Sequence, residues 1–247
     1  MYIEAIKTHR IHLNESLFDV LDCYLPLLQE GSLIAVTSKI ISLSQGRVVS
    51  KETCSKEDLI RQEADAVAET TFLPYGIFLT IKNNILIPSA GIDDSNSEGN
   101  FILYPQDLQK TAASLWSYVR AKHNLKSLGI LITDSHTTPL RRGVTGIALG
   151  WCGFEPLYSY IEKQDIYENP LRVTQANLLD GLAAAAVLVM GEGNEQTPLA
   201  LITNAPKMTF LSRPPTLEEE ATFSIPMEDD LYAPLLMNTS WVRSKVS

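Results

Sequence analysis

The stretch Gly129-Ile-Leu-Ile-Thr-Asp134-Ser135-His136-Thr-Thr-Pro-Leu-Arg141-Arg142-Gly143 lies at the centre of the interpretation. Its apolar run before a polar turn predicts a short buried strand over residues 130–132. Asp134 and Ser135 follow, and they offer the hard oxygen ligands that Mg²⁺ or Mn²⁺ takes. Arg141 and Arg142 carry planar guanidinium groups that suit phosphate or carboxylate oxygens. The loop predicts a cation site beside an anion site, although a capped turn with a surface salt bridge uses the same residue types.

A second polar segment follows a predicted hairpin, whose strands cover residues 77–81 and 85–87. It reads Ser89-Ala-Gly-Ile-Asp93-Asp-Ser-Asn96. Gly91 permits close backbone approach, and the carboxylates beyond it are suited to a cation. Asp, Asn, Ser and Gly also dominate ordinary turns, so a turn without a ligand is the alternative interpretation.

A third segment ends a predicted helix over residues 178–190, whose many small residues imply that another element packs closely against it. The segment consists of Met190, Gly191, Glu192, Gly193, Asn194 and Glu195. Two glycines around Glu192 would let backbone amides approach a phosphate while the carboxylate reaches a metal. A plain helix C-cap explains Gly191 equally well.

The rest of the chain alternates between helical and strand patterns. Ser55 and Asp58 resemble a capping box at the start of a helix. Further helices are predicted over residues 17–28, bent at Pro26, and over 59–70 and 105–122. Further strands are predicted within residues 1–13 and over 33–36, 171–174 and 199–202.

The composition excludes several classes of protein. A chain of 247 residues can bury a substantial core as one domain or two. The net charge of −9 argues against a nucleic-acid binder. No apolar run reaches the roughly 18–20 residues of a membrane span, and the N-terminus does not resemble a signal peptide. Three widely spaced cysteines indicate a reducing cytoplasm rather than a disulfide framework or zinc cluster.

Asp93, Asp134 and Glu192 each follow a predicted element, so we expect them to meet at one rim of a sheet. Together they would hold one or two cations against a triphosphate. The chain contains no Gly-x-x-x-x-Gly-Lys-Ser/Thr loop, which excludes an ordinary P-loop enzyme. It also lacks a Gly-x-Ser-x-Gly elbow, so a Ser-His-Asp hydrolase is poorly supported.

Several runs resemble one known family in the same order along the chain. They include Val36 to Ser42, Ala90 to Asn96, Ile132 to Ser135 and Val189 to Gly193. They are similar to the γ-glutamyl ligases that add L-glutamate to the deazaflavin precursor of coenzyme F-420. The resemblance covers residues 1–204, and we expect residues 205–247 to form an acidic C-terminal extension packed on that domain.

The resemblance implies a mixed α+β fold, a homodimer, and an amide ligase that uses GTP or ATP with Mg²⁺ or Mn²⁺. Asp93 and Asp134 would hold one metal, and Ser135 and Glu192 a second. Ser38, Lys39, Asn96 and the loop from Met190 to Glu195 would line the nucleotide. Arg141 and Arg142 are predicted to be catalytic, because charge builds on phosphoryl oxygens during the reaction.

The chain departs from the family pattern at three places, of which the first bears on the nucleotide and the other two on the acceptor. Leu43 stands where the family has a nucleotide-contacting lysine, and Thr137-Thr138 and Glu168-Asn169 replace Gly-Arg pairs. Because the deazaflavin precursor carries a phosphodiester, losing arginines favours an acceptor without one, and we predict a folate. The alternatives are the deazaflavin itself, a non-catalytic nucleotide or folate binder, and a metal-dependent phosphohydrolase.

Overall fold

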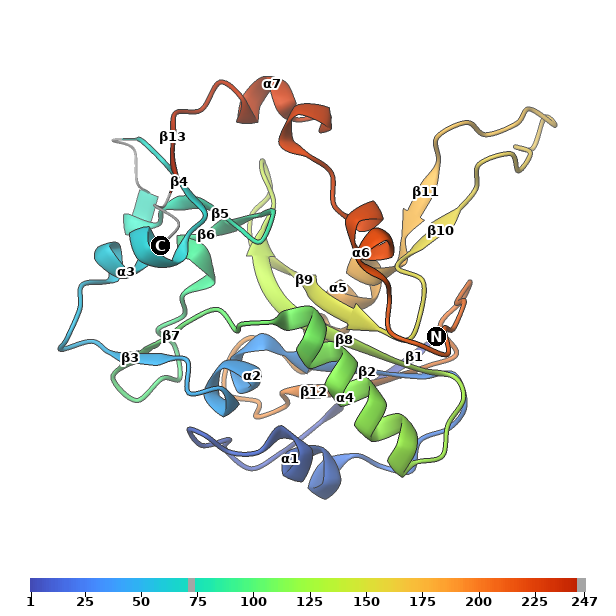
Figure 1. Cartoon of the computed structure of the whole chain (residues 1–247), viewed down its shortest axis with the longest axis horizontal. Coiled ribbons are helices and arrows are strands. Elements are labelled where there is room, and N and C mark those ends of the chain that lie inside the picture. Colours follow the sequence, from blue (N-terminus) through green and yellow to red (C-terminus); the bar gives the residue numbers. More distant parts are fainter. Residues whose placement is uncertain (71–73, 244–247) are drawn as a thin grey trace.

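The computed structural model describes residues 1–70 and 74–243 and shows a mixed α+β protein with several sheets (Figure 1). A five-stranded sheet forms its centre. In spatial order the strands are β1 (Tyr2–Ile6), β12 (Leu199–Thr203), β2 (Ser32–Thr37), β8 (Leu128–Thr137) and β9 (Val144–Cys152). Strands β2 and β8 are parallel, whereas the other neighbouring pairs are antiparallel. The carboxyl ends of β2 and β8 therefore lie at the same edge of the sheet.

Helices cover both faces of the central sheet. On one face lie α1 (Leu17–Tyr24), α2 (Ser38–Ser44) and α4 (Leu108–Lys122), and on the other lies α5 (Leu178–Met190). Along β8, Ile130 and Ile132 pack on the face that α1, α2 and α4 cover. Leu131 packs on the opposite face, against α5. Because both faces are buried, this strand is continuously apolar instead of alternating.

Helix α5 lies close against the sheet, as its small residues predict. A Cβ atom added to Gly146 of β9 would lie 2.4 Å from the backbone oxygen of Ala183. Ala183 and Ala186 are fully buried at this contact. The small side chains let the helix backbone approach the strand, which places the end of α5 beside the ends of β2 and β8.

A second sheet of four strands stands beside the central one. Its order is β13 (Trp241–Arg243), β4 (Ala66–Ala68), β5 (Leu79–Lys82) and β6 (Ile85–Pro88). Helix α3 (Lys56–Glu63) packs Leu59 and Ile60 into the core of this part. The remaining elements here are η1 (Pro74–Gly76), η2 (Ser89–Gly91) and the antiparallel pair β3 (Val48–Ser50) and β7 (Asn100–Ile102).

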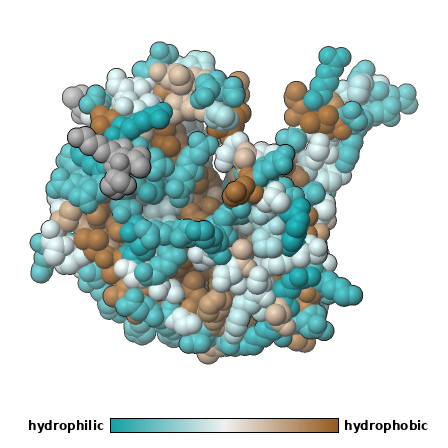
Figure 2. Space-filling view, viewed as in Figure 1, coloured by the Kyte–Doolittle hydropathy of each residue, from teal (hydrophilic) through white to brown (hydrophobic). Residues whose placement is uncertain are grey.

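Two segments extend from this body. Strands β10 (Leu157–Ser159) and β11 (Gln175–Asn177) begin an arm that stands away from the rest of the molecule (Figures 1 and 2). The C-terminal segment contains α6 (Leu217–Phe223), η3 (Met227–Asp229), α7 (Ala233–Leu236) and β13. It runs from the central sheet to the second sheet, where β13 pairs with β4. The last four residues of the predicted extension lie outside the described range.

Several predicted boundaries are wrong for local reasons. Helix α1 ends at Tyr24 because Leu25 precedes Pro26 and is extended. Helix α3 ends at Glu63, since residues 66–68 pair with β5 as a strand. Residues 171–174 form no strand, and the pairing segment begins at Gln175. Strand β8 continues through Asp134 to Thr137 because β9 pairs with it along that length.

No helix in the described part of the chain combines the length and apolar character that crossing a membrane requires. The mixed architecture agrees with the predicted fold class.

Candidate active site

A cavity of about 390 Å³ opens where β2 ends, beside Asp134 and Ser135 of β8. Its other walls come from the loop after β1, the start of α2, the segment between η2 and α4, and the loop after α5. Segments that are distant in sequence therefore share one cavity. This agrees with the prediction that the acidic loops meet at the rim of a sheet.

The parallel pairing of β2 and β8 places Ser38 beside Asp134. Thr37 pairs with Thr133, so the residues that follow them, Ser38 and Asp134, both line the cavity. The Ser38 hydroxyl donates a hydrogen bond to Asp134 Oδ2 at 3.0 Å. The Ser135 backbone N–H donates to Asp134 Oδ1 at 2.8 Å. These two bonds fix the carboxylate toward the cavity.

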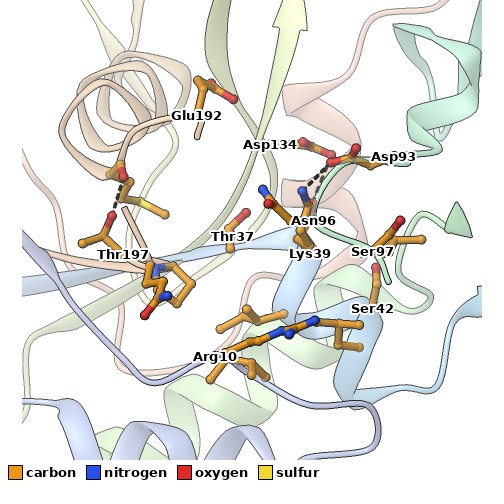
Figure 3. A pocket seen from close by; sticks show the side chains of 18 of the residues that line it. Arg10, Thr37, Lys39, Ser42, Asp93, Asn96, Ser97, Asp134, Glu192 and Thr197 are labelled. Atoms are coloured by element: carbon orange, nitrogen blue, oxygen red, sulfur yellow. Dashed lines mark hydrogen bonds and ion pairs between the residues drawn. The ribbon is translucent and has the colours of Figure 1, made fainter. Parts of the chain in front are cut away.

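Asp93 approaches the same point from the second sheet. Its backbone exchanges two hydrogen bonds with Ile102, which anchor the residue after the η2 turn. Lys39 Nζ lies 2.6 Å from Asp93 Oδ2 (Figure 3). Burial raises the pKa of Asp93, but the hydrogen bond and charge of Lys39 outweigh it and leave the pKa below its ordinary value. Asp93 is therefore ionised and paired.

Asp134 lies beside Asp93 (Figure 3), and its hydrogen bonds among the described residues come from Ser38 and Ser135. Burial raises the pKa of Asp134 to about 6, and the nearby charge of Asp93 acts in the same direction. The hydrogen bonds from Ser135 and Ser38 and the charge of Lys39 only partly oppose this effect. A carboxylate that is buried beside a second carboxylate gains most from a bound cation.

Glu192 stands across the cavity, on the loop after α5 (Figure 3). Burial raises its pKa, and a hydrogen bond with the Ser135 side chain partly lowers it again. The loop is tied to the opposite wall, because Asn96 Nδ2 donates to the Gly193 carbonyl oxygen at 3.1 Å. Within the loop, the Gly193 N–H donates to Glu195 Oε2 at 2.8 Å.

Asp93, Asp134, Ser135 and Glu192 all line the cavity, and their assignment to two metal-binding pairs stays a prediction. Their oxygen atoms are all hard ligands of the kind that Mg²⁺ and Mn²⁺ prefer. No three His, Cys, Asp or Glu side chains among the described residues are grouped as a complete metal site. A cation here would therefore complete its shell with water or substrate phosphate, as Mg²⁺ commonly does.

The structure brings nearly all of the predicted site residues to this cavity. Its lining includes Ser38, Lys39, Asp93, Asn96, Asp134, Ser135, Met190, Gly191, Glu192, Gly193, Asn194 and Glu195. Arg141 and Arg142 do not line it. They lie exposed in the turn between β8 and β9, so their catalytic role stays a prediction. Leu43, at the position of the family lysine, does line the cavity.

Several other residues line the cavity although they lie outside the motifs predicted to form the site. The loop from Thr8 to Leu13 forms one rim, and the Arg10 guanidinium pairs with Glu98 across it. This loop carries a sequence signal that could have placed it at the site, the closely spaced side chains of His9, Arg10 and His12. Tyr104 and Thr197 also line the cavity. Thr197 directly follows the polar run from Glu192 to Gln196, whereas Tyr104 stands in an apolar run without a polar signal.

Comparison with known families identifies this arrangement. The family model described as F420-0:Gamma-glutamyl ligase matches residues 5–204, which is most of the chain. The chain belongs to this family. Membership confirms the resemblance found in the sequence and the predicted enzyme class, an amide-forming ligase.

The chain is similar to several relatives over most of their length. Coenzyme F420:L-glutamate ligase of Methanosarcina acetivorans is 30% identical over 224 residues, covering 82% of this chain and 86% of the relative. The protein of the same name from Methanopyrus kandleri is 29% identical over 192 residues, covering 70% and 75%. That from Archaeoglobus fulgidus is 29% identical over 190 residues, covering 70% and 76%. These names do not support the predicted folate acceptor.

Proposed function

We propose that this protein is a metal- and nucleotide-dependent γ-glutamyl ligase that joins L-glutamate to the deazaflavin precursor of coenzyme F-420. The gathering of Asp93, Asp134, Ser135 and Glu192 in one cavity carries the proposal. The names of the relatives supply the amino acid and the acceptor. The deazaflavin thus replaces folate as the favoured acceptor.

In this proposal Asp93 and Asp134 hold one divalent cation, and Ser135 and Glu192 hold another. Bound cations would offset the charge that builds on phosphoryl oxygens. GTP or ATP would lie along Ser38, Lys39, Asn96 and the loop from Met190 to Glu195. Lys39 lies within an ion-pair distance of Asp93 and adds positive charge beside the phosphates.

The chemistry has two steps. A carboxylate oxygen of the acceptor attacks the γ-phosphorus, the bond to the bridging oxygen breaks, and an acyl phosphate and a nucleoside diphosphate form. The amine of L-glutamate then attacks the acyl carbon, phosphate leaves, and the nitrogen loses a proton. In this proposal the cavity would bring the reactants together for both steps, and positioning is a main way in which proteins accelerate phosphoryl transfer.

The test is product analysis with purified protein. L-glutamate, Mg²⁺ or Mn²⁺, and either GTP or ATP are combined with the deazaflavin precursor or with tetrahydrofolate. We expect phosphate release and a gain of one glutamate or more by mass spectrometry on the deazaflavin. A gain on tetrahydrofolate alone would revive the folate interpretation, for which Thr137-Thr138 and Glu168-Asn169 are the sequence observations. Phosphate release that needs no glutamate would indicate a phosphohydrolase.

Two neighbouring carboxylates provide a matched control for this assay. Asp93 lines the cavity, whereas Asp94 lies outside its lining and pairs with Lys56 at 3.2 Å. We expect Asp93→Asn to abolish amide formation and Asp94→Asn to leave it near the wild-type rate. Equal rates in both variants would remove Asp93 from the metal site.

The proposal includes a homodimer formed through the arm that begins with β10 and β11. Ile166, Tyr167 and Val173 on this arm are 89%, 78% and 84% exposed. Figure 2 shows hydrophobic atoms on the projecting arm. Apolar side chains gathered on a projecting segment are typical of a surface that a partner covers. The double variant Ile166→Asp with Val173→Asp should shift the mass in light scattering from dimer to monomer. Leu27→Asp, at an equally exposed position, should not.

A cytoplasmic location completes the proposal. Cys23, Cys54 and Cys152 are all free, and Cys23 is exposed. An exposed free thiol is typical of proteins in a reducing compartment.

A further inference from the structure

Tyr104 places a buried phenol at the wall of the cavity. The residue is 1% exposed and lines the cavity. Its hydroxyl group has no hydrogen-bond partner among the described residues. A buried hydroxyl without a partner destabilises a fold, whereas a phenylalanine could fill the same volume without that penalty. The polar atom therefore requires an explanation other than packing.

The surroundings of Tyr104 hold the phenol in place. The Ser42 hydroxyl donates to the Leu103 carbonyl oxygen at 2.7 Å, and Arg47 Nε donates to the Tyr104 carbonyl oxygen at 3.3 Å. One edge of the ring lies against Gly91, where an added Cβ would approach Tyr104 Cδ2 to 2.4 Å. The backbone and the ring are both fixed, so the hydroxyl cannot turn away to find another acceptor.

Burial raises the pKa of Tyr104 far above its ordinary value, and the charges of Asp134 and Asp65 raise it further. Of these two carboxylates, only Asp134 lines the cavity. Asp134 receives hydrogen bonds from Ser38 and Ser135, whereas the Tyr104 hydroxyl has no partner among the described residues. The phenol is thus a fixed, unpaired donor in the wall of the cavity that contains Asp134. An oxygen atom bound beside Asp134 would provide the acceptor.

We propose that Tyr104 is a positioning residue for the metal–phosphate group, and that its hydroxyl donates a hydrogen bond to an oxygen of that group. The oxygen belongs to a water on the cation or to a nucleotide phosphate. The inference rests on the proposed metal and nucleotide site but not on the identity of the acceptor. The inference gives the unpaired Tyr104 hydroxyl a role in binding the metal or the nucleotide.

Tyr104→Phe tests this assignment through binding and stability instead of turnover. Without metal, the variant should unfold at the same temperature as the wild type or higher, because it loses an unpaired buried polar group. By calorimetry it should bind Mn²⁺ alone, or Mn²⁺ with GDP or ADP, about tenfold more weakly, since a hydrogen bond to a charged group is lost. Weakening with Mn²⁺ alone identifies the metal-bound water, and weakening only with nucleotide identifies the phosphate.

Tyr118→Phe is the matched control. The Tyr118 hydroxyl donates to Asp22 at 2.7 Å, and neither residue lines the cavity. This variant should lose a little stability and keep wild-type binding. Two results would overturn the role of Tyr104 but not the proposed function. One is wild-type binding by Tyr104→Phe, and the other is easier unfolding of the metal-free Tyr104→Phe protein. A wild-type protein that binds neither Mn²⁺ nor nucleotide would overturn the proposed function together with the role of Tyr104.

Discussion

At the scale of single residues, Asp134 determines how the metal-free protein responds to pH. Its pKa of about 6 lies above the ordinary value of 3.8, so the folded state favours the protonated form. The stability that this group contributes is fully present below pH 3.8 and is lost as the pH rises through about 6. A shift of this size corresponds to at most about 3 kcal/mol.

Asp134→Asn should remove this dependence because the amide carries no charge. Relative to the wild type, the variant should gain up to about 3 kcal/mol in free energy of unfolding between pH 4 and pH 7. Urea denaturation of both metal-free proteins across this range measures the difference. A constant difference would show that Asp134 does not titrate in this window. With nucleotide and metal, the same variant should be inactive.

Lys39 competes with a cation for Asp93, since its ammonium lies 2.6 Å from the carboxylate. Lys39→Gln should therefore bind Mn²⁺ alone more tightly than the wild type. It should bind Mn²⁺ with nucleotide more weakly, because a positive charge beside the phosphates is lost. Lys56→Gln, which removes the ion pair to Asp94, is the control and should change neither affinity. Titration calorimetry measures both, and a parallel change in the two affinities would contradict the competition.

At the scale of elements, the end of α5 controls the position of Glu192. Gly191 has φ 82° and ψ 170°, a conformation that is almost confined to glycine. A Cβ atom there would lie 2.5 Å from the Glu195 carboxyl carbon. The turn therefore depends on the absence of a side chain at this position.

Gly191→Ala should destabilise the protein by about 1–3 kcal/mol and weaken nucleotide binding, because the loop that carries Glu192 must shift. Gly181, within the same helix, is exposed and has open space around its Cβ position. Gly181→Ala should instead stabilise the helix by about 0.5–1 kcal/mol and leave binding unchanged. Thermal unfolding and calorimetry compare the two. Equal effects would show that the loop tolerates a side chain at Gly191.

Elements whose signals are local could be predicted from the sequence, and elements that depend on tertiary pairing could not. Helix α5 has its predicted bounds because Asn177 caps one end and Gly191 the other, so both signals are local. Helix α2 was not predicted, since it follows β2 directly and Thr37 makes no side-chain cap. The short β4 was assigned to a helix, because only its pairing with β5 and β13 makes it a strand.

The cavity residues that belong to local polar motifs could be predicted from the sequence. Asp93 and Glu192 follow elements as expected, whereas Asp134 lies within β8. The parallel pairing of β2 and β8 brought Asp134 beside Ser38. Arg141 and Arg142 were assigned to the site by nearness in sequence, but β8 continues past Asp134 and carries them to an exposed turn. The unpaired Tyr104 hydroxyl arises only from tertiary contacts, so no sequence pattern could reveal it.

At the scale of the whole molecule, the C-terminal segment links the two sheets. The Phe223 ring of α6 lies 5.2 Å from the Trp151 ring of β9, and β13 pairs with β4 at the other end. The family match ends at residue 204, and the last cavity-lining residue is Pro198. The segment thus holds the sheets together without contributing to the wall of the cavity.

A chain truncated after Arg213 tests this division of roles. It should lose the β13 pairing and the Phe223 contact, and therefore unfold at a lower temperature than the full chain. Phe223→Ala in the full chain should lose less, about 1–2 kcal/mol, since a partly buried ring packed on the core is removed while the β13 pairing stays. Both proteins should bind Mn²⁺ with nucleotide as the wild type does at temperatures where circular dichroism shows them folded. Weaker binding by the folded, truncated chain would mean that linking the sheets also sets the distance between Asp93, beside the second sheet, and Asp134, on the central one.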